Sequence, residues 1–236
     1  ATASNPHLPE DYLDNLKDIY PDQLLKAYTE GEFVNLTQGT VYTSFSRTKC
    51  DCSSVVEGNE ELRVGMDFNV TKMSAVIYVL RKVEGKTKPV WDAVDELEGI
   101  YDTPAMIVAL RHNYPKNPIN VYPDASGKSR KTVEASTSDI TLLEEAGFGI
   151  RVNRKNPFIK DRVMATNAAF DNGWVRVNCD ACPSFASNLE QLSYDAAGVP
   201  DKTSGLDHLI DAGTYPIAYE MPITRPLANA AIKFNF

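Results

Sequence analysis

The 236-residue sequence has no long hydrophobic run, few cysteines and histidines, and fewer basic than acidic residues. No apolar segment approaches the ~20 residues needed to span a bilayer, which excludes an integral membrane protein. The N-terminus lacks the charged and apolar regions of a signal peptide. It also lacks an initiator methionine, so we expect a processed product or a piece of a longer protein.

The sequence also lacks a phosphate-binding loop. Gly127-Lys128-Ser129 resembles the end of one, but the earlier glycine that the motif requires would fall at Tyr122. No other segment matches the motif, so we do not expect this chain to hydrolyse ATP.

The four cysteines form two pairs, Cys50-Asp-Cys52 and Cys179-Asp-Ala-Cys182. Two thiolate pairs can complete a tetrahedral zinc site. The first pair has one intervening residue rather than two, however, and the pairs lie far apart in the sequence. Two interpretations stay open, a zinc site and four free thiols in a reducing cytoplasm, and the spacing favours the second.

The net charge of −8 is unevenly distributed along the chain. Residues 1–60 carry 4 basic and 10 acidic groups, whereas residues 108–170 carry 10 basic and 6 acidic groups. One basic stretch in an acidic chain permits a local phosphate-binding face. It argues against strong, nonspecific binding to DNA by the isolated chain.

The hydrophobic pattern predicts three strands in succession, followed by alternating helices and strands, which indicates a mixed α/β sheet. Before these elements, one helix opens at Pro9 and a second helix, begun by Pro21, spans Asp22–Glu30. Residues 39–45 are predicted to form a short strand, 51–59 a linker, and the tail from Met221 a loose segment. The predicted strands are 62–70, 74–83, 90–100, 119–123, 148–152 and 174–178. The predicted helices are 103–113, capped by Thr103, then 138–146, 159–171, 184–194 and 206–215, the last ending before Pro216.

Three groups of acidic residues are candidates for chemistry. Asp67 lies in an apolar strand, where a carboxylate is costly unless it is paired, binds a cation or faces solvent. Asp124 directly follows another apolar strand, either at a ligand-binding sheet edge or in a simple turn. Asp207, His208 and Asp211 share a helix face, which is either a binding face or a solvated helix start.

If these groups converge, they form a site for hard divalent cations, which prefer oxygen ligands. Two such ions would activate water and stabilise the leaving oxygen of a phosphodiester. Asp67, Asp124 and Asp211 are then the candidate metal ligands, and His208 is a candidate ligand or proton-transfer group.

The residues resemble the large terminase subunits of tailed double-stranded DNA phages. The resemblance is carried by Gly65-Met-Asp-Phe-Asn69, by Tyr122-Pro-Asp-Ala-Ser-Gly127 and by Lys202 with Asp207-His-Leu-Ile-Asp-Ala-Gly-Thr-Tyr215. It also covers Asn5-Pro-His-Leu-Pro9 and Tyr28-Thr-Glu-Gly-Glu-Phe-Val34, which are similar to the segment that joins the family's ATPase to its nuclease. The order and spacing of these motifs are more specific than any one of them.

The resemblance implies a ribonuclease-H-like (retroviral integrase superfamily) fold, with a mixed central sheet flanked by helices and an N-terminal helical extension. It implies a linker at residues 1–60 and a nuclease domain at 61–236, with Asp67, Asp124 and Asp211 as ligands of Mg²⁺ or Mn²⁺ and His208 beside them. The expected activity is cleavage of concatemeric viral DNA during packaging, with an ATPase domain, a portal and a small terminase subunit as partners. The expected location is the host cytoplasm and, transiently, the procapsid portal.

A set of basic residues after the second motif is the candidate DNA-binding face, which we expect to contact phosphates without reading bases. These residues are Lys128, Arg130, Lys131, Arg151, Arg154, Lys155, Lys160 and Arg162. Two other functions stay open at this point. One is a junction resolvase or transposase of the same superfamily, and the other is a non-catalytic module that clamps DNA or docks on the portal.

Overall fold

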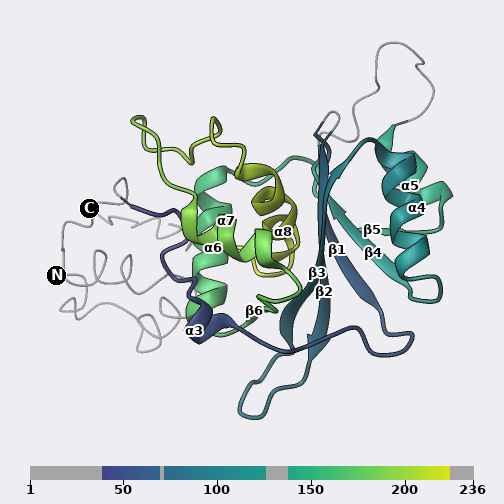
Figure 1. The fold of residues 1–236 in the computed structure, drawn as a ribbon, viewed down its shortest axis with the longest axis horizontal. Helices are drawn as coiled ribbons and strands as arrows, with labels where there is room; N and C mark the ends of the chain where they lie inside the picture. Colours follow the sequence, from purple (N-terminus) through teal and green to yellow (C-terminus); the bar gives the residue numbers. More distant parts are fainter. Residues whose placement is uncertain (1–38, 70–71, 126–137, 224–236) are drawn as a thin grey trace, which may run out of the picture.

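The computed structural model describes residues 39–69, 72–125 and 138–223, and its centre is a six-stranded sheet in the order β5-β4-β1-β2-β3-β6 (Figure 1). The first three strands form an antiparallel meander, and β4, β5 and β6 join it in parallel. The strands are β1 (Leu62–Asp67), β2 (Met73–Arg81), β3 (Val90–Ile100), β4 (Ile119–Pro123), β5 (Gly149–Ile150) and β6 (Val175–Val177). The helices predicted before residue 39, and the tail beyond residue 223, lie outside the described residues.

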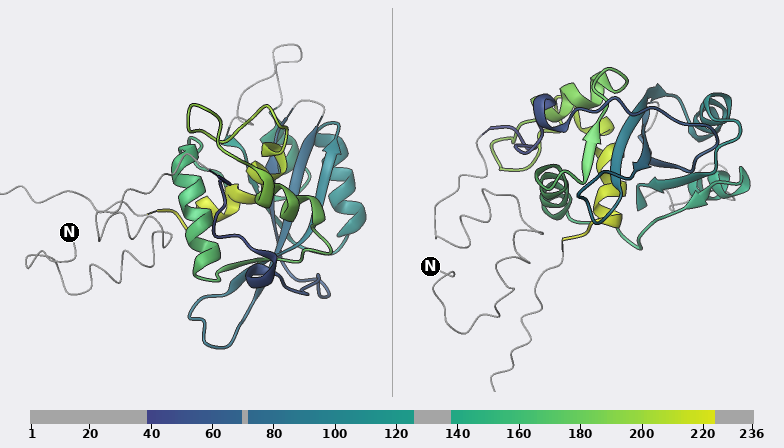
Figure 2. Two further views of the ribbon diagram at one scale, coloured as in Figure 1. Left: turned by 60° about the vertical axis from the view of Figure 1, so that its left-hand side comes forward. Right: turned by 90° about the horizontal axis from the view of Figure 1, so that it is seen from below.

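Helices cover both faces of the sheet (Figures 1 and 2). One face carries α4 (Thr103–Asn113) and α5 (Asp139–Glu145), and the other carries α6 (Ile159–Asp171), α7 (Pro183–Gln191) and α8 (Asp207–Glu220). A short helix, α3 (Arg47–Cys50), lies on the side of α6 and α7. This arrangement confirms the predicted mixed α/β sheet. No helix among the described residues has the length and apolar character to cross a membrane.

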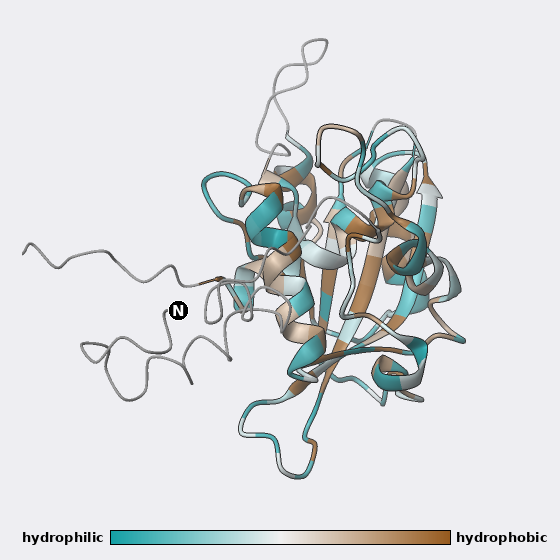
Figure 3. Cartoon of the chain, turned by 90° about the vertical axis from the view of Figure 1, so that its left-hand side faces the viewer, coloured by the Kyte–Doolittle hydropathy of each residue, from teal (hydrophilic) through white to brown (hydrophobic). Residues whose placement is uncertain are grey.

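The two faces of the sheet bury separate hydrophobic clusters. In β2, Val76 and Tyr78 belong to the cluster under α6–α8, whereas Ala75, Ile77 and Val79 belong to the cluster under α4 and α5. Successive side chains of a strand point to opposite faces, so a strand covered on both sides is apolar throughout. Figure 3 shows these hydrophobic stretches along the central strands.

Part of the predicted N-terminal linker is packed against the sheet. Val41, Tyr42 and Phe45 contribute buried side chains to the cluster under α6–α8. The described residues 39–45 form no strand, and Thr40 makes only an isolated bridge to Ser193. The expectation of a strand was therefore wrong, although the segment is buried.

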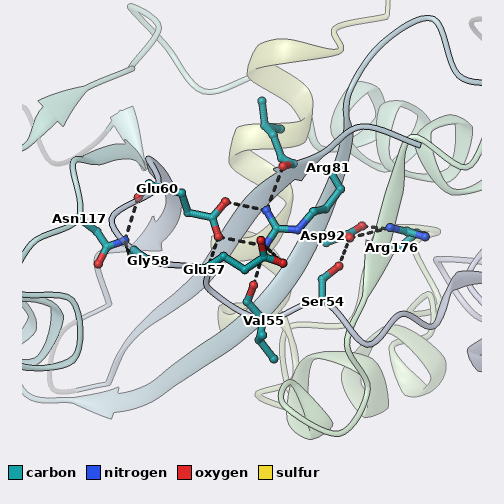
Figure 4. A network of polar contacts seen from close by, with 10 residues as sticks. Ser54, Val55, Glu57, Gly58, Glu60, Arg81, Asp92, Asn117 and Arg176 are labelled. Carbon is teal, nitrogen blue, oxygen red and sulfur yellow. Dashed lines mark hydrogen bonds and ion pairs between the residues drawn. The ribbon is translucent and has the colours of Figure 1, made fainter. Parts of the chain in front are cut away.

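Two polar networks, each built around an ion pair, hold residues 54–60 against the sheet (Figure 4). Arg81 on β2 donates to Glu60 at 2.6 Å and to the Val55 carbonyl at 2.6 Å. Asp92 on β3 is fully buried, pairs with Arg176 of β6 at 2.7 Å and accepts from the Ser54 hydroxyl. Both buried or half-buried carboxylates therefore have an arginine partner, as burial of a charge requires.

The predicted end of the last helix was wrong, because α8 continues through Pro216 to Glu220. Proline cannot donate to the carbonyl four residues earlier, which belongs to Ala212. That carbonyl faces Gly65 of β1, where an added Cβ would lie only 1.9 Å from the Ala212 oxygen. A glycine in β1 therefore leaves room for the carbonyl that Pro216 cannot bond.

The N-cap of α4 differs from the prediction by one residue, although the range of the helix agrees. Asp102, not Thr103, is the N-cap, and its side chain accepts from the Ala105 amide at 2.8 Å. The Thr103 hydroxyl instead donates to Asp139 of α5 at 2.7 Å. Thr103 thus joins two helices rather than capping one.

Candidate active site

Two neighbouring parallel strands place two carboxylates at one edge of the sheet. Asp67 is the last residue of β1, and Asp124 directly follows β4. Met66 pairs with Pro123 in the ladder, and the Asp124 amide donates to the Met66 carbonyl at 3.1 Å. The carboxyl ends of parallel strands meet at the same edge, which is where α/β proteins bind ligands.

Helix α8 brings the third carboxylate to this edge. It packs directly on β1 through the close approach of Ala212 to Gly65, and the Tyr78 hydroxyl of β2 donates to the Gly213 carbonyl at 2.8 Å. These contacts fix the rotation of the helix. Asp211, one residue before Ala212, therefore lies beside the strand ends.

The four predicted catalytic residues line one cavity of about 310 Å³. The structure brings together Asp67 at the end of β1, Asp124 after β4 and Asp211 on α8. His208 lies on α8 one turn before Asp211. The lining consists of Asp67, Phe68, Asn69, Asp124, Asn156, Pro157, Ile159, Arg162, Lys202, Asp207, His208, Asp211 and Tyr215.

His208 lies between side chains of β1 and the start of α8. Its Nδ1 is 3.2 Å from Asp67 Oδ2, and the Asn69 amide nitrogen is 2.9 Å from Nε2. Asp207 Oδ1 is 3.9 Å from the same Nε2. The imidazole orientation is thus set by Asp67 and Asn69 together. Asn69 was not singled out from the sequence, although it lies in the motif around Asp67.

Arg162 does not lie where the sequence placed it. It was expected on an exposed DNA-binding face, but it is only 5% exposed, and its guanidinium pairs with Asp211 at 2.5 Å. The guanidinium also lies over the Tyr215 ring, 4.7 Å from its centroid. A signal for this burial was present, because Arg162, Thr166 and Ala169 are spaced to share one helix face.

The remaining basic candidates fall into two sets. Arg151, Arg154, Lys155 and Lys160 are exposed near the cavity, before and at the start of α6. Lys128, Arg130 and Lys131 lie outside the described residues.

The cavity is lined by four carboxylates and by two cations, Arg162 and Lys202. Burial, reinforced by the negative charge of Asp211, raises the pKa of Asp67 to about 6. Burial also raises the pKa of Asp211, although Arg162 opposes the shift. Among the described residues, Asp207 Oδ1 is buried without a hydrogen-bond partner. Several carboxylate oxygens around one cavity suit a hard divalent cation.

The ligands do not form a closed set as they stand. Within residues 39–69, 72–125 and 138–223, no three His, Cys, Asp or Glu side chains are grouped so that they could hold a metal ion. The carboxylates line the same cavity but do not converge on one position where an ion could contact all of them, and Asp211 forms an ion pair with Arg162. Binding a cation therefore requires small movements of these side chains.

The cysteines give the zinc interpretation no support. All four are free thiols, and Cys50, Cys179 and Cys182 are buried. Burial raises the pKa of the Cys179 thiol to about 12 and that of Cys182 further. A raised pKa disfavours the thiolate, which is the form that binds zinc.

A mixed sheet with helices on both faces and acids at the ends of its neighbouring central strands defines a ribonuclease-H-like fold. The chain belongs to the family of terminase RNase H-like domains, whose model matches residues 64–220. No curated protein matches the chain.

Solved structures of three phage proteins share the fold. The large terminase of a thermophilic bacteriophage, in its crystal form 3, is 19% identical, with a TM-score of 0.66 over 91% of this chain and 53% of its own. The nuclease domain of the P22 large terminase is 15% identical, with a TM-score of 0.57 over 80% and 96%. The large terminase nuclease of thermophilic phage G20c, solved with bound cobalt, is 14% identical, with a TM-score of 0.52 over 78% and 98%. The chain thus spans about half the length of the first of these proteins.

Proposed function

We propose that this chain is the nuclease domain of a phage DNA-packaging motor, and that it cleaves concatemeric double-stranded DNA with divalent cations. The observation that carries the proposal is the meeting of Asp67, Asp124 and Asp211 around one cavity, with the pKa values of Asp67 and Asp211 raised by burial. Membership of the terminase family and the likeness to nuclease domains of phage terminases support it.

Mg²⁺ or Mn²⁺, bound as two ions during catalysis, is the proposed cofactor. Asp67, Asp124 and Asp211 would hold the ions, and the G20c relative with bound cobalt is in keeping with a divalent metal. The ions would supply an activated water and a stabilised leaving oxygen for in-line phosphodiester hydrolysis. Magnesium and manganese both favour carboxylate oxygens over thiolates.

The chain's own residues prepare the site. Asp67 and Asn69 orient the His208 imidazole, which is placed to hold or move a proton at the cavity. Arg162 holds the Asp211 carboxylate on the cavity wall. No base-reading element is part of this arrangement among the described residues, so the proposed cleavage has little sequence specificity.

The proposed setting is the host cytoplasm and the procapsid portal. We infer as partners an ATPase domain, which residues 1–60 would join to the nuclease domain at 61–236, the portal and the small terminase subunit. The net charge of −8 fits a nuclease whose DNA is delivered by a motor rather than captured from solution.

The test is cleavage of supercoiled plasmid in Mg²⁺, in Mn²⁺ and in EDTA, by the wild type and by Asp67→Asn. We expect metal-dependent nicking and linearisation that the substitution abolishes, with Asp201→Asn, an acid outside the cavity, as the matched control. Cleavage that survives Asp67→Asn rejects the proposed site. DNA binding without cleavage at any metal concentration favours a clamping or docking module, and preferential cutting of branched junctions favours a resolvase.

A further inference from the structure

A loop with an unusual composition lies between β5 and α6. Residues 151–158 join these two elements, and Asn156, Pro157 and the following Ile159 line the acidic cavity. The loop therefore forms one rim of the proposed active site. We call residues 151–158 the rim loop.

The rim loop is tied to a catalytic carboxylate. The Asn156 side-chain nitrogen donates to Asp124 Oδ1 at 2.5 Å, and its oxygen accepts from the Ala125 amide at 2.8 Å. The nitrogen and the oxygen of the Asn156 side-chain amide thus both bond to the turn that carries Asp124. Any ligand that positions the rim loop also positions this carboxylate.

The rim loop and the first residues of α6 have the charge expected of a DNA contact. Residues 151–160 contain four basic and no acidic residues, in a chain of net charge −8. All four basic side chains are exposed: Arg151, Arg154, Lys155 and Lys160. The neighbouring carboxylates repel phosphates, so basic groups at the rim are needed to hold DNA over the cavity.

The large apolar side chain with the greatest exposure among the described residues stands in the same place. Phe158, the N-cap residue of α6, is 76% exposed, and it is flanked by the cavity residues Pro157 and Ile159. A single exposed phenylalanine is common on protein surfaces. This one lies at the edge of an acidic cavity, in a ten-residue segment, 151–160, that has four exposed cations and no acid. An apolar side chain among cations beside the proposed active site is suited to contact DNA.

We propose that Phe158 is an apolar contact to duplex DNA beside the scissile phosphate, with Arg154 and Lys155 on the flanking phosphates. This inference rests on the proposed function, because it takes DNA as the substrate. The Phe158 ring packs in the groove against the sugar and base edges, while the basic side chains contact the backbone. Asn156 then links the engaged rim loop to Asp124.

Salt dependence separates an apolar contact from an ionic one. Each phosphate contact by a cation releases counterions and steepens the fall of affinity with salt, whereas an apolar contact leaves that slope unchanged. Fluorescence anisotropy in EDTA, over a range of salt concentrations, measures the affinity of the chain for duplex DNA. The duplex has about 30 base pairs, which is long enough to cover the site of a module this size. The variants are Phe158→Ala, Phe158→Trp, Lys155→Gln and, on the opposite face of the sheet, Val108→Ala.

We expect Phe158→Ala to weaken binding about tenfold at every salt concentration with an unchanged slope, and Phe158→Trp to keep most of the affinity. Lys155→Gln should reduce the slope by about one unit, and Val108→Ala, which removes another exposed apolar group, should change nothing. The inference is overturned if Phe158→Ala binds as tightly as Val108→Ala, if it changes the slope as Lys155→Gln does, or if the wild type does not bind DNA.

These measurements do not depend on catalysis, because they are made without divalent metal. If the chain binds DNA through Phe158 but never cleaves plasmid, the proposed nuclease function is rejected and the proposed Phe158 contact is supported. If the chain cleaves plasmid with full activity and Phe158→Ala binds DNA as the wild type does, the proposed function is supported and the proposed Phe158 contact is rejected. Unchanged melting temperatures of the variants show that binding, not folding, was altered.

Discussion

The Arg162 guanidinium lies 2.5 Å from Asp211 Oδ1 at the wall of the acidic cavity, and it is only 5% exposed. The pair gives the cavity an internal cation before any metal binds. Asp211 is therefore shared between a fixed positive charge and the proposed metal. Loss of the arginine leaves a buried, unpaired carboxylate, which is far more costly than loss of an exposed ion pair.

Arg162→Met is expected to destabilise the metal-free protein by about 3 kcal/mol, because Asp211 loses its buried partner. Mn²⁺ should restore part of this loss, since the ion takes over the compensation of Asp211. Urea unfolding in EDTA and in Mn²⁺ measures both effects.

The control for this experiment is Arg176→Met, which breaks the buried Asp92 ion pair outside the cavity. We expect it to destabilise the protein without rescue by Mn²⁺. Equal rescue of both variants, or of neither, would contradict a metal role for Asp211.

Asp67 gives the metal-free protein a defined pH dependence. Because its folded pKa is raised from 3.8 to about 6, the folded state binds more protons than the unfolded state between these values. The free energy of unfolding should therefore fall as the pH rises from about 4 to 6. Asp67→Asn removes this dependence, so its stability relative to the wild type should rise over that window by on the order of 3 kcal/mol.

Urea unfolding from about pH 4 to about pH 7.5 in EDTA spans this window and tests the expectation. Asp201→Asn serves as the control, because hydrogen bonds from Thr203 lower the pKa of Asp201. The stability that Asp201 contributes therefore changes only below about pH 3.8, so the Asp201→Asn profile should run parallel to that of the wild type over this window. A wild type and an Asp67→Asn variant with parallel pH profiles would show that Asp67 is not a buried, proton-holding acid.

Gly65→Ala is expected to destabilise the protein by more than about 2 kcal/mol, because the new methyl group would collide with the Ala212 carbonyl and Pro216. Both neighbours belong to the backbone or a rigid ring of α8, so the helix itself must shift. Gly149→Ala is the matched strand control, since its methyl group would meet the flexible end of Asn120. Urea unfolding compares the two variants, and similar stabilities would refute the close packing of α8 on β1.

Much of the fold could be predicted from local patterns. The bounds of β3, β4, α4 and α6 agree with the predicted ranges, because proline, glycine or polar residues flank each element and mark its ends. The end of α8 could not be predicted in this way. Whether a helix continues past Pro216 depends on the strand that faces its unbonded carbonyl, and Gly65 on that strand is far away in the sequence.

The acidic residues of the candidate site could be predicted from the sequence, but the residues that contact them could not. Asp67 and Asp124 stand at the ends of apolar strands, and Asp211 shares a helix face with His208, so spacing alone marked them. The positions of Arg162 and Asn156 depend on how α6 and the rim loop pack against α8 and β4, which no local pattern encodes. The sequence consequently assigned Arg162 to the surface and did not mark Asn156 at all.

The most direct test of the central claim is crystallography of the wild type soaked in Mn²⁺, with an anomalous difference map. We predict manganese peaks in the cavity, in contact with the carboxylates of Asp67, Asp124 and Asp211, and loss of the peaks in Asp67→Asn crystals soaked in the same way. A wild-type map with no peak in the cavity, or with a peak that persists in Asp67→Asn, would contradict the claim that these three carboxylates hold the catalytic metal.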